Sequence, residues 1–217
     1  MPQVFKIISL QLLKNMNDTI FLKNFIEPPV DRKKILHYAK SGAEDQILLQ
    51  IQQLLEESLP HFSYKIAYGR FPINSDGNAL DLGFARVHSN DLKNALLGCK
   101  EIILFAATIG IQADRLISKY SRFSPAKGLL LQAIGTERVE SLCDLFCLEM
   151  KEQLKRDGLA TRPRFSPGYG DLPLTLQKEI IRKLDCTKNI GISLNQQLLM
   201  TPSKSITAII GLEERKA

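Results

Sequence analysis

The chain has 217 residues, of which 44% are apolar and 24% charged, with 13 Gly and 10 Pro. These proportions are typical of a globular protein of one or two domains and exclude collagen, coiled-coil and disordered chains. The 29 Lys and Arg residues exceed the 23 Asp and Glu residues by 6, but the densest basic stretch is only Arg32-Lys33-Lys34. Because nucleic-acid-binding surfaces usually carry a basic stripe interleaved with aromatic residues, we expect no nucleic-acid partner.

The apolar residues near the amino terminus imitate a signal-peptide core, but Gln11 and Lys14 interrupt them and no small-residue cleavage pattern follows. Other apolar runs fall short of the roughly 20 residues that a membrane-spanning helix needs. The four cysteines are too sparse for a disulfide framework and lack metal-ligand spacing. We therefore expect a cytoplasmic protein with reduced thiols, no membrane partner and no metal site of its own.

Residues 1–29 are mixed in character and end at Pro28-Pro29. This pattern suggests an N-terminal extension, an arm or a helix, that lies outside the central fold. We expect residues 30–217 to form one domain.

Apolar residues at three- and four-residue spacing predict a helix from Asp31 and another over 47–55. The next stretch, 62–68, alternates apolar and polar residues, as does 80–84 after the turn-rich segment 74–78. Alternation of this kind on both sides of a turn predicts a β-hairpin with one buried face.

The middle of the chain has a clearer pattern. Residues 91–97 form a predicted helix capped by Ser89 or Asn90. The apolar run 102–107 predicts a central strand covered on both faces. A further helix is expected over 111–120.

The longest periodic segment, 127–156, predicts the core helix, with a single apolar stripe. The stripe comprises Val139, Leu142, Phe146, Met150 and Leu154. A Pro/Gly-rich loop over 161–173, a helix over 176–184 and a closing strand over 206–210 follow. The uneven alternation of strands and helices predicts an α+β fold, a mainly antiparallel twisted sheet with helices packed around it.

The loop 164–173 reads Arg-Phe-Ser-Pro-Gly-Tyr-Gly-Asp-Leu-Pro and is the most unusual segment. Its two prolines fix φ, whereas Gly168 and Gly170 allow positive φ and close approach of a ligand to the main chain. Arg164 offers a planar fork that can bind a carboxylate bidentately. Tyr169 offers an aromatic face that attracts cations, and a sulfonium is a cation.

A structural interpretation of the same loop stands beside the functional one. The loop can be a rigid connector in which Asp171 or Thr175 caps the following helix. The residues by themselves leave both interpretations open.

The loop resembles the activation domain of cobalamin-dependent methionine synthase, whose pattern Arg-x-x-Pro-Gly-Tyr is matched at Arg164, Pro167, Gly168 and Tyr169. The resemblance, most of all to free-standing members of the family, covers about residues 30–211. It extends to Ala106-Ala107-Thr108-Ile109-Gly110, Ala133-Ile134-Gly135, Val139-Glu140, Lys188-Asn189-Ile190-Gly191, Leu194, Met200, Pro202 and Ser205.

The resemblance implies a repair function. In that family the domain binds S-adenosylmethionine and presents it to cobalamin held by another module. Oxidation strands the cofactor as inactive Co(II), and reduction by flavodoxin or a similar one-electron donor is uphill. Methyl transfer from the sulfonium to Co(I) removes the product of reduction and pulls that step forward. The expected partners are therefore a corrinoid-binding methionine synthase subunit and a one-electron donor, and the cobalamin is carried by the partner.

The resemblance also implies roles for single residues. Arg164 would bind the methionine carboxylate, Pro167 and Gly168 would give main-chain contacts to the ligand, and Tyr169 would line the pocket. Positioning is the main contribution expected of the protein, since a methyl sulfonium is a good donor and Co(I) a strong nucleophile.

Two carboxylates are further candidates. Glu140 lies off the apolar stripe, near an acidic position of the family, and would meet the ligand's ammonium group; as an alternative it is a solvated acid on a helix face. Asp45, just before the helix that begins Gln46-Ile47, resembles an amino-group ligand of the family; as an alternative it is a favourable charge at a helix N-terminus.

Other functions remain open. In the fused synthase, a segment beyond the closing strand supplies a Tyr that contacts the cofactor, and this sequence shows no counterpart after Gly211. The chain could therefore be a docking module for a corrinoid protein that binds no nucleotide, or an activator of another corrinoid methyltransferase. Cys143 and Cys147, four residues apart, could be redox groups or, as we expect, small buried hydrophobes.

Overall fold

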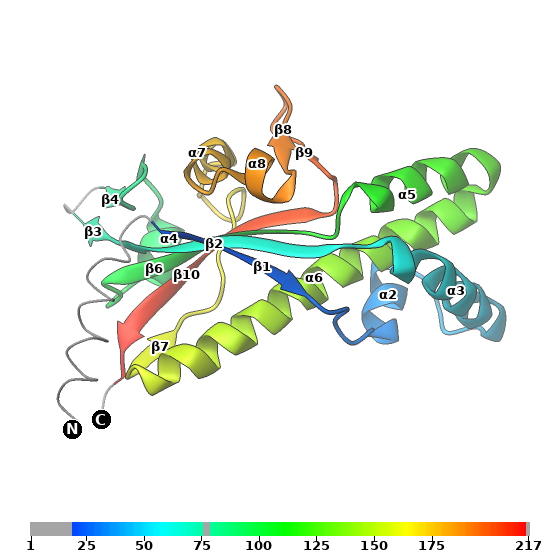
Figure 1. The fold of residues 1–217 in the computed structure, drawn as a ribbon, viewed down its shortest axis with the longest axis horizontal. Helices are drawn as coiled ribbons and strands as arrows, with labels where there is room; N and C mark the ends of the chain where they lie inside the picture. The colour runs from blue at the N-terminus through cyan, green and yellow to red at the C-terminus, as the bar shows by residue number, and fades with distance from the viewer. Residues whose placement is uncertain (1–18, 76–78, 216–217) are drawn as a thin grey trace.

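A computed structural model of the chain describes residues 19–75 and 79–215, and Figure 1 shows its helices and strands. The elements along the chain are β1 (Ile20–Phe25), α2 (Arg32–Ala39), α3 (Asp45–Ser58), the 3-10 helix η1 (Leu59–His61), β2 (Tyr64–Pro72), β3 (Asn74–Ser75), β4 (Leu80–Asp81), β5 (Arg86–Val87), α4 (Asn90–Ala95), β6 (Glu101–Thr108), α5 (Ile111–Phe123), α6 (Pro125–Arg156), β7 (Leu159–Thr161), α7 (Leu176–Lys183), α8 (Cys186–Ile190), β8 (Ser193–Leu194), β9 (Met200–Thr201) and β10 (Ser205–Glu214). Helices surround an antiparallel sheet, which confirms the predicted α+β class.

The main sheet has five strands in the order β1-β2-β6-β10-β7, and all its pairings are antiparallel. Its middle strand, β6, places Phe105 opposite Tyr68 of β2 and Ala208 of β10. Every residue from Ile102 to Thr108 is buried, because helices cover both faces of the sheet at this strand. The predicted central strand is thus confirmed.

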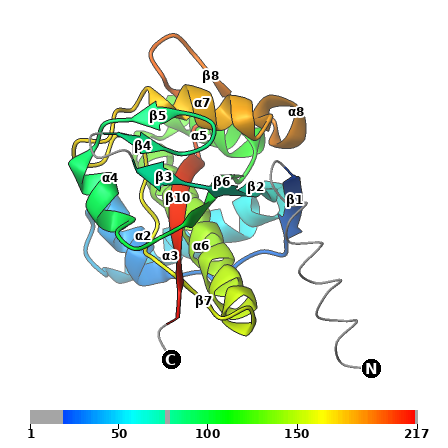
Figure 2. The same ribbon diagram turned by 90° about the vertical axis from the view of Figure 1, so that its left-hand side faces the viewer.

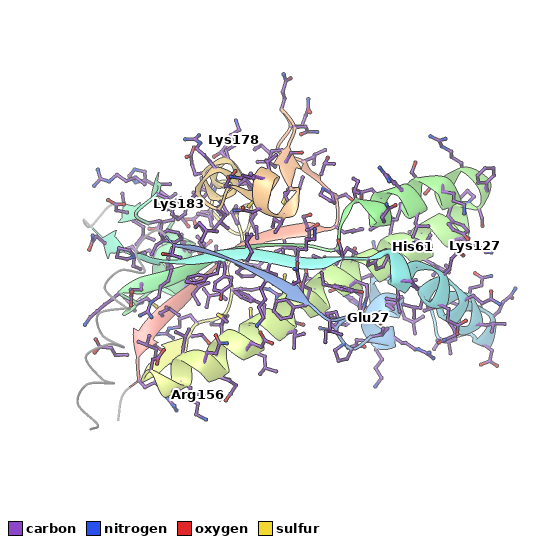
Figure 3. All side chains as sticks on the ribbon, in the orientation of Figure 1. Glu27, His61, Lys127, Arg156, Lys178 and Lys183 are labelled. Carbon is purple, nitrogen blue, oxygen red and sulfur yellow. The ribbon has the colours of Figure 1, made fainter. Side chains whose placement is uncertain are left out.

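The two faces of the sheet are covered by different helices, as Figures 1 and 2 show. On one face, Ile66 and Phe105 pack against Phe146 of α6. On the other face, Leu104 and Ile209 share a core with α7 and α8. Alternate residues of a strand point to opposite faces, so β2, β6 and β10 each contribute to both cores. Figure 3 shows Lys178 and Lys183 of α7 on one side of the sheet and Arg156, at the end of α6, on the other.

Helix α6 joins the sheet to a helical end formed with α2, α3 and α5. The helix begins with Pro125 after the cap residue Ser124, a position where proline is well tolerated. Its first half packs against α2, α3 and α5, where Leu130 and Ile134 are buried. Its second half lies under the sheet and carries the predicted apolar stripe, all of which is buried: Val139, Leu142, Phe146, Met150 and Leu154.

A fully buried ion pair fastens the segment before α2 to α6. Arg138 donates to the Glu137 carboxylate at 2.6 Å and to the main-chain carbonyls of Pro28 and Pro29 at 2.6 and 2.8 Å. Glu137 in turn accepts from the main-chain N–H of Asp31 at 3.0 Å. A buried charge needs such partners, because removing an unpaired charge from water is very costly. The sequence alone assigned no role to either residue.

The structure changes the prediction for the N-terminal segment. Residues 1–18 lie outside the described part, but Ile20–Phe25 forms β1, an edge strand that pairs with β2 over its whole length. The Pro28-Pro29 pair therefore follows a strand of the sheet and does not divide an extension from the fold. The strand was missed because its apolar residues are irregularly spaced and it is only half-buried.

The predicted hairpin between 62–68 and 80–84 is wrong. Both edges of β2 are already occupied, one by β1 and the other by β6. Residues Leu80 and Asp81 instead form β4, the middle strand of a small sheet with β3 and β5. The alternation of apolar and polar residues over 80–84 reflects burial: Leu80 and Leu82 pack into the core under α7 without pairing with β2.

Candidate functional site

The loop after β7 leaves the sheet at a defined point. Phe165 still pairs with Ile209 of β10 through two main-chain hydrogen bonds of 2.8 and 2.9 Å. The chain then turns, with Gly168 N–H donating to the Leu172 carbonyl at 2.9 Å. Gly168 has φ +87°, and a Cβ there would lie 3.0 Å from Leu174 Cδ1. Both observations explain why this turn needs glycine.

A second set of contacts holds the loop to α4. The Asp171 carboxylate accepts from the main-chain N–H groups of Asn90 and Asp91 at 2.7 and 3.2 Å, and from the Ser89 hydroxyl. The Asp91 carboxylate accepts from Asp171 N–H at 3.0 Å. The hydrogen bond from Ser89, with those from the two N–H groups, lowers the pKa of Asp171. Asp171 therefore binds the start of α4, supplementing the Ser89 cap, and not the start of the helix that follows it.

A groove of about 620 Å³ lies beside this loop, where the segment that follows β7 has turned away and, within the described residues, no longer pairs with the start of β10. Its walls come from α6, the loop, α7, the β8–β9 hairpin and β10. They include Glu140, Arg164, Gln177, Leu199 and Thr207. The groove combines a charged end with an apolar wall, as small-molecule sites usually do.

Arg164 is the only guanidinium among the described lining residues of this groove. Its Nη2 donates to Oε2 of Glu140, and its Nη1 donates to Oδ1 of Asp144 at 2.9 Å. The side chain is 25% exposed, so it can be reached from the groove. The arrangement offers a charged fork suited to a carboxylate, with two acidic side chains already bound to it.

Three of the residues predicted for the site line the groove: Arg164, Pro167 and Glu140. Gly168 and Tyr169 are not among its lining residues: Gly168 lies in the turn that follows Pro167, and Tyr169 is 72% exposed and packs edge-on against Phe165 with ring centroids 5.7 Å apart. The structure thus brings Arg164, Pro167 and Glu140 to one groove.

Asp45 lies elsewhere. It is the first residue of α3, at the helical end in Figure 1, and it is not among the residues that line the groove. This placement agrees with the alternative interpretation of Asp45, because a negative charge in the first turn of a helix is favourable.

Sequence reasoning missed the far wall of the groove. Leu174, Leu198 and Leu199 supply apolar surface, and Gln177 is a buried polar residue on the inner side of α7. Gln177 could have been noticed, since it interrupts the apolar face of that helix. Leu198 carried no comparable signal, because its place depends on a β8–β9 turn in which it adopts φ +64°.

The cysteines fit the structural interpretation. All four are free, and burial raises the pKa of Cys186 to about 12 and also raises the pKa of Cys143. A thiol that stays protonated is a poor nucleophile and a poor metal ligand. Within residues 19–75 and 79–215, no group of three or more His, Cys, Asp and Glu side chains could hold a metal ion, and no helix is both long and apolar enough to cross a membrane.

Comparison with known proteins gives one kind of match. No family model matches the sequence, and no curated protein does. The structure matches the crystal structure of the MetH reactivation domain bound to AdoHcy, with a TM-score of 0.70 over 92% of this chain and 80% of that chain. The chain has the fold of the MetH reactivation domain. Sequence identity is 14%, so what the two proteins share is this fold.

Within the reactivation-domain fold, the groove and the Arg-x-x-Pro-Gly-Tyr loop lie together beside the start of β10. The fold positions them through the Phe165 pairing on one side and the Asp171 contacts with α4 on the other. A fold alone does not specify a function, so the function must be argued from this groove and its side chains.

Proposed function

We propose that this chain is an activation subunit that binds S-adenosylmethionine and supports reductive methylation of inactive Co(II) cobalamin in a cobalamin-dependent methionine synthase. One observation carries the proposal. The loop that resembles the family's pattern places Arg164 in a groove of about 620 Å³, in a chain that has the reactivation-domain fold. The comparison structure holds AdoHcy, the product that S-adenosylmethionine leaves after methyl transfer.

The groove matches the ligand in its distribution of charge. Arg164 would bind the methionine carboxylate through its guanidinium fork, and Glu140, beside it, would bind the ammonium group. The apolar wall of Leu174, Leu198 and Leu199 would accept the less polar parts of the nucleoside. These contacts orient the ligand while leaving its methyl group free to face a partner.

The chemical step requires little of this chain. The partner supplies a reduced corrinoid as methyl acceptor, and a one-electron donor such as a flavodoxin supplies the electron that reduces it. The Co(I) nucleophile would supply the electron pair of the new bond to the methyl carbon as the C–S bond breaks, and the sulfur keeps the pair of the broken bond as S-adenosylhomocysteine. No proton moves, so the groove needs no general acid or base; its contribution is to hold the sulfonium in place.

A methyl-transfer assay tests the proposal. The chain is mixed with a Co(II)-cobalamin-loaded methionine synthase subunit, a one-electron donor and methyl-labelled S-adenosylmethionine, and label on the corrinoid is measured. We expect label only when all components are present, and an initial rate lower by about tenfold or more with Arg164→Ala at limiting ligand, the scale of a lost charged hydrogen bond. Arg182→Ala is the control, since Arg182 is an exposed residue of α7 that pairs with Glu179.

The assay also separates the two alternative functions. A docking module would bind the corrinoid subunit but transfer no label. An activator of another corrinoid methyltransferase would bind S-adenosylmethionine but label only that other corrinoid protein. Either result would overturn the proposed role in methionine synthase.

A further inference from the structure

Arg164 lies between two hollows. One is the groove described above, and the other, of about 440 Å³, lies between α6 and the segment that runs from Thr161 to Arg164. Arg164 lines both. Glu140 lines only the groove, whereas Asp144, one helical turn further along α6, lines only the second hollow.

The two carboxylates divide the guanidinium between them. Nη2 donates to Glu140 on the groove side, and Nη1 donates to Asp144 on the other side, at 2.9 Å. A bidentate grip on a carboxylate needs two parallel N–H groups of one guanidinium directed at the same ligand. A ligand carboxylate in the groove therefore competes with a carboxylate of the protein.

The hydrogen bond from Arg164 to Asp144 opposes a bidentate contact between Arg164 and a ligand in the groove. It draws Nη1 toward the second hollow, away from the groove, whereas the Glu140 contact already lies on the ligand's side. Asp144 would not be left unpaired if Arg164 moved, because its other oxygen accepts from Lys34 Nζ of α2 at 2.9 Å. The Arg164–Asp144 pair is partly exposed, so releasing it has a modest free-energy cost.

We propose that Asp144 competes with the carboxylate of the ligand for Arg164 and thereby sets the affinity of the groove for ligands held through a carboxylate. The inference rests on the proposed function, since it takes an amino-acid-bearing nucleoside as the ligand. It makes Asp144 a specificity-determining residue that acts through Arg164. Nucleosides without a carboxylate do not engage the competition.

Calorimetric titration of two ligands into two variants tests this. The ligands are S-adenosylmethionine and 5′-methylthioadenosine, which lacks the amino-acid part. In Asp144→Asn, the dissociation constant for S-adenosylmethionine should fall about three- to fivefold, the range for a partly exposed ion pair. The constant for methylthioadenosine should stay the same. Glu152→Gln is the matched control: it removes the same charge from an exposed position two turns further along α6, and should change neither constant.

Each outcome has a definite meaning. Wild-type binding with a constant that Asp144→Asn leaves unchanged or weakens would overturn the competition and leave the proposed function intact. Equal tightening of both ligands would also overturn it, because the effect would not depend on a carboxylate. If neither ligand binds to the wild type or to either variant, the proposed function fails and the competition fails with it.

Discussion

Asp171 and Asp91 form a reciprocal pair of hydrogen bonds: the Asp91 carboxylate accepts from the main-chain N–H of Asp171 at 3.0 Å, and the Asp171 carboxylate accepts from that of Asp91 at 3.2 Å. The two residues lie 80 positions apart in the sequence, one in the loop and one in the first turn of α4. This reciprocal pair of hydrogen bonds, called the clasp below, connects the loop 164–173 to α4. Rigid support of this kind keeps a binding loop in one geometry.

Replacing Asp171 by Asn should loosen the clasp and lower the melting temperature at neutral pH. Because the folded-state pKa of Asp171 is lowered, its carboxylate contributes stability above the ordinary value of 3.8, and this contribution is lost as the pH falls below it. The difference in melting temperature between wild type and variant should therefore shrink on acidification below that value. Thermal unfolding followed by circular dichroism, from neutral pH down to below the ordinary carboxyl pKa, measures it; a difference that grows toward low pH would contradict the assignment.

Gly170→Ala should disrupt the clasp sterically. Gly170 has φ +55°, and a Cβ there would lie 2.1 Å from Asp91 Oδ2. We expect a loss in unfolding free energy above the ~1–2 kcal/mol that left-handed backbone alone costs. Gly158→Ala is the matched control, since Gly158 has φ +75° but a Cβ there would meet nothing within 4 Å. Urea denaturation of both variants gives the comparison, and equal losses would mean that the Asp91 contact contributes nothing.

Arg138→Met should be among the most damaging substitutions in the chain. It leaves Glu137 buried with a charge but without its guanidinium, which typically costs about 3–5 kcal/mol. The double variant Glu137→Gln with Arg138→Met should be less destabilised than the single one, because no unpaired charge remains. Chemical denaturation measures both. A double variant that is less stable than Arg138→Met would show that the charge is not the cause.

Substitution of Phe146 tests whether a core lies between α6 and the sheet. Its ring is fully buried and contacts Phe105, Tyr68 and Phe25 with ring centroids 5.0, 5.1 and 6.5 Å away. Phe146→Ala should destabilise the protein by about 3–5 kcal/mol. Phe123→Ala should change stability by less than about 0.5 kcal/mol, because Phe123 is 82% exposed at the end of α5. Similar losses in the two variants, measured by urea denaturation, would contradict the packing described for α6.

Local patterns were enough for much of the fold. The stripe of α6, the Ser89 cap of α4 and the apolar run of β6 each depend on neighbouring residues, and all three are confirmed. Strand pairing was harder to predict, because β2 could pair with any strand of suitable length. Only the complete sheet shows that β1 and β6 occupy its two edges.

The candidate site likewise has a part that the local sequence predicts and a part that depends on how distant elements pack together. The charged end of the groove was predictable from the loop, where Arg164 and two glycines have clear chemical meanings. The pairing of Arg164 with Asp144 was not, since it depends on how closely α6 passes the loop. The apolar wall around Leu198 depends on the placement of the β8–β9 hairpin over α7 and β10, which no local pattern indicates.

Calorimetric titration of the purified chain with S-adenosylmethionine, run beside Arg164→Ala, tests most directly whether the groove binds this ligand through Arg164. We expect one-site binding by the wild type and a dissociation constant about 10- to 100-fold higher in the variant, the equivalent of a lost charged hydrogen bond. Both proteins must have the same circular dichroism spectrum for the comparison to count. Equal affinity in two folded proteins would contradict the role of Arg164, and no binding by the wild type up to millimolar ligand would contradict the proposed function of this chain.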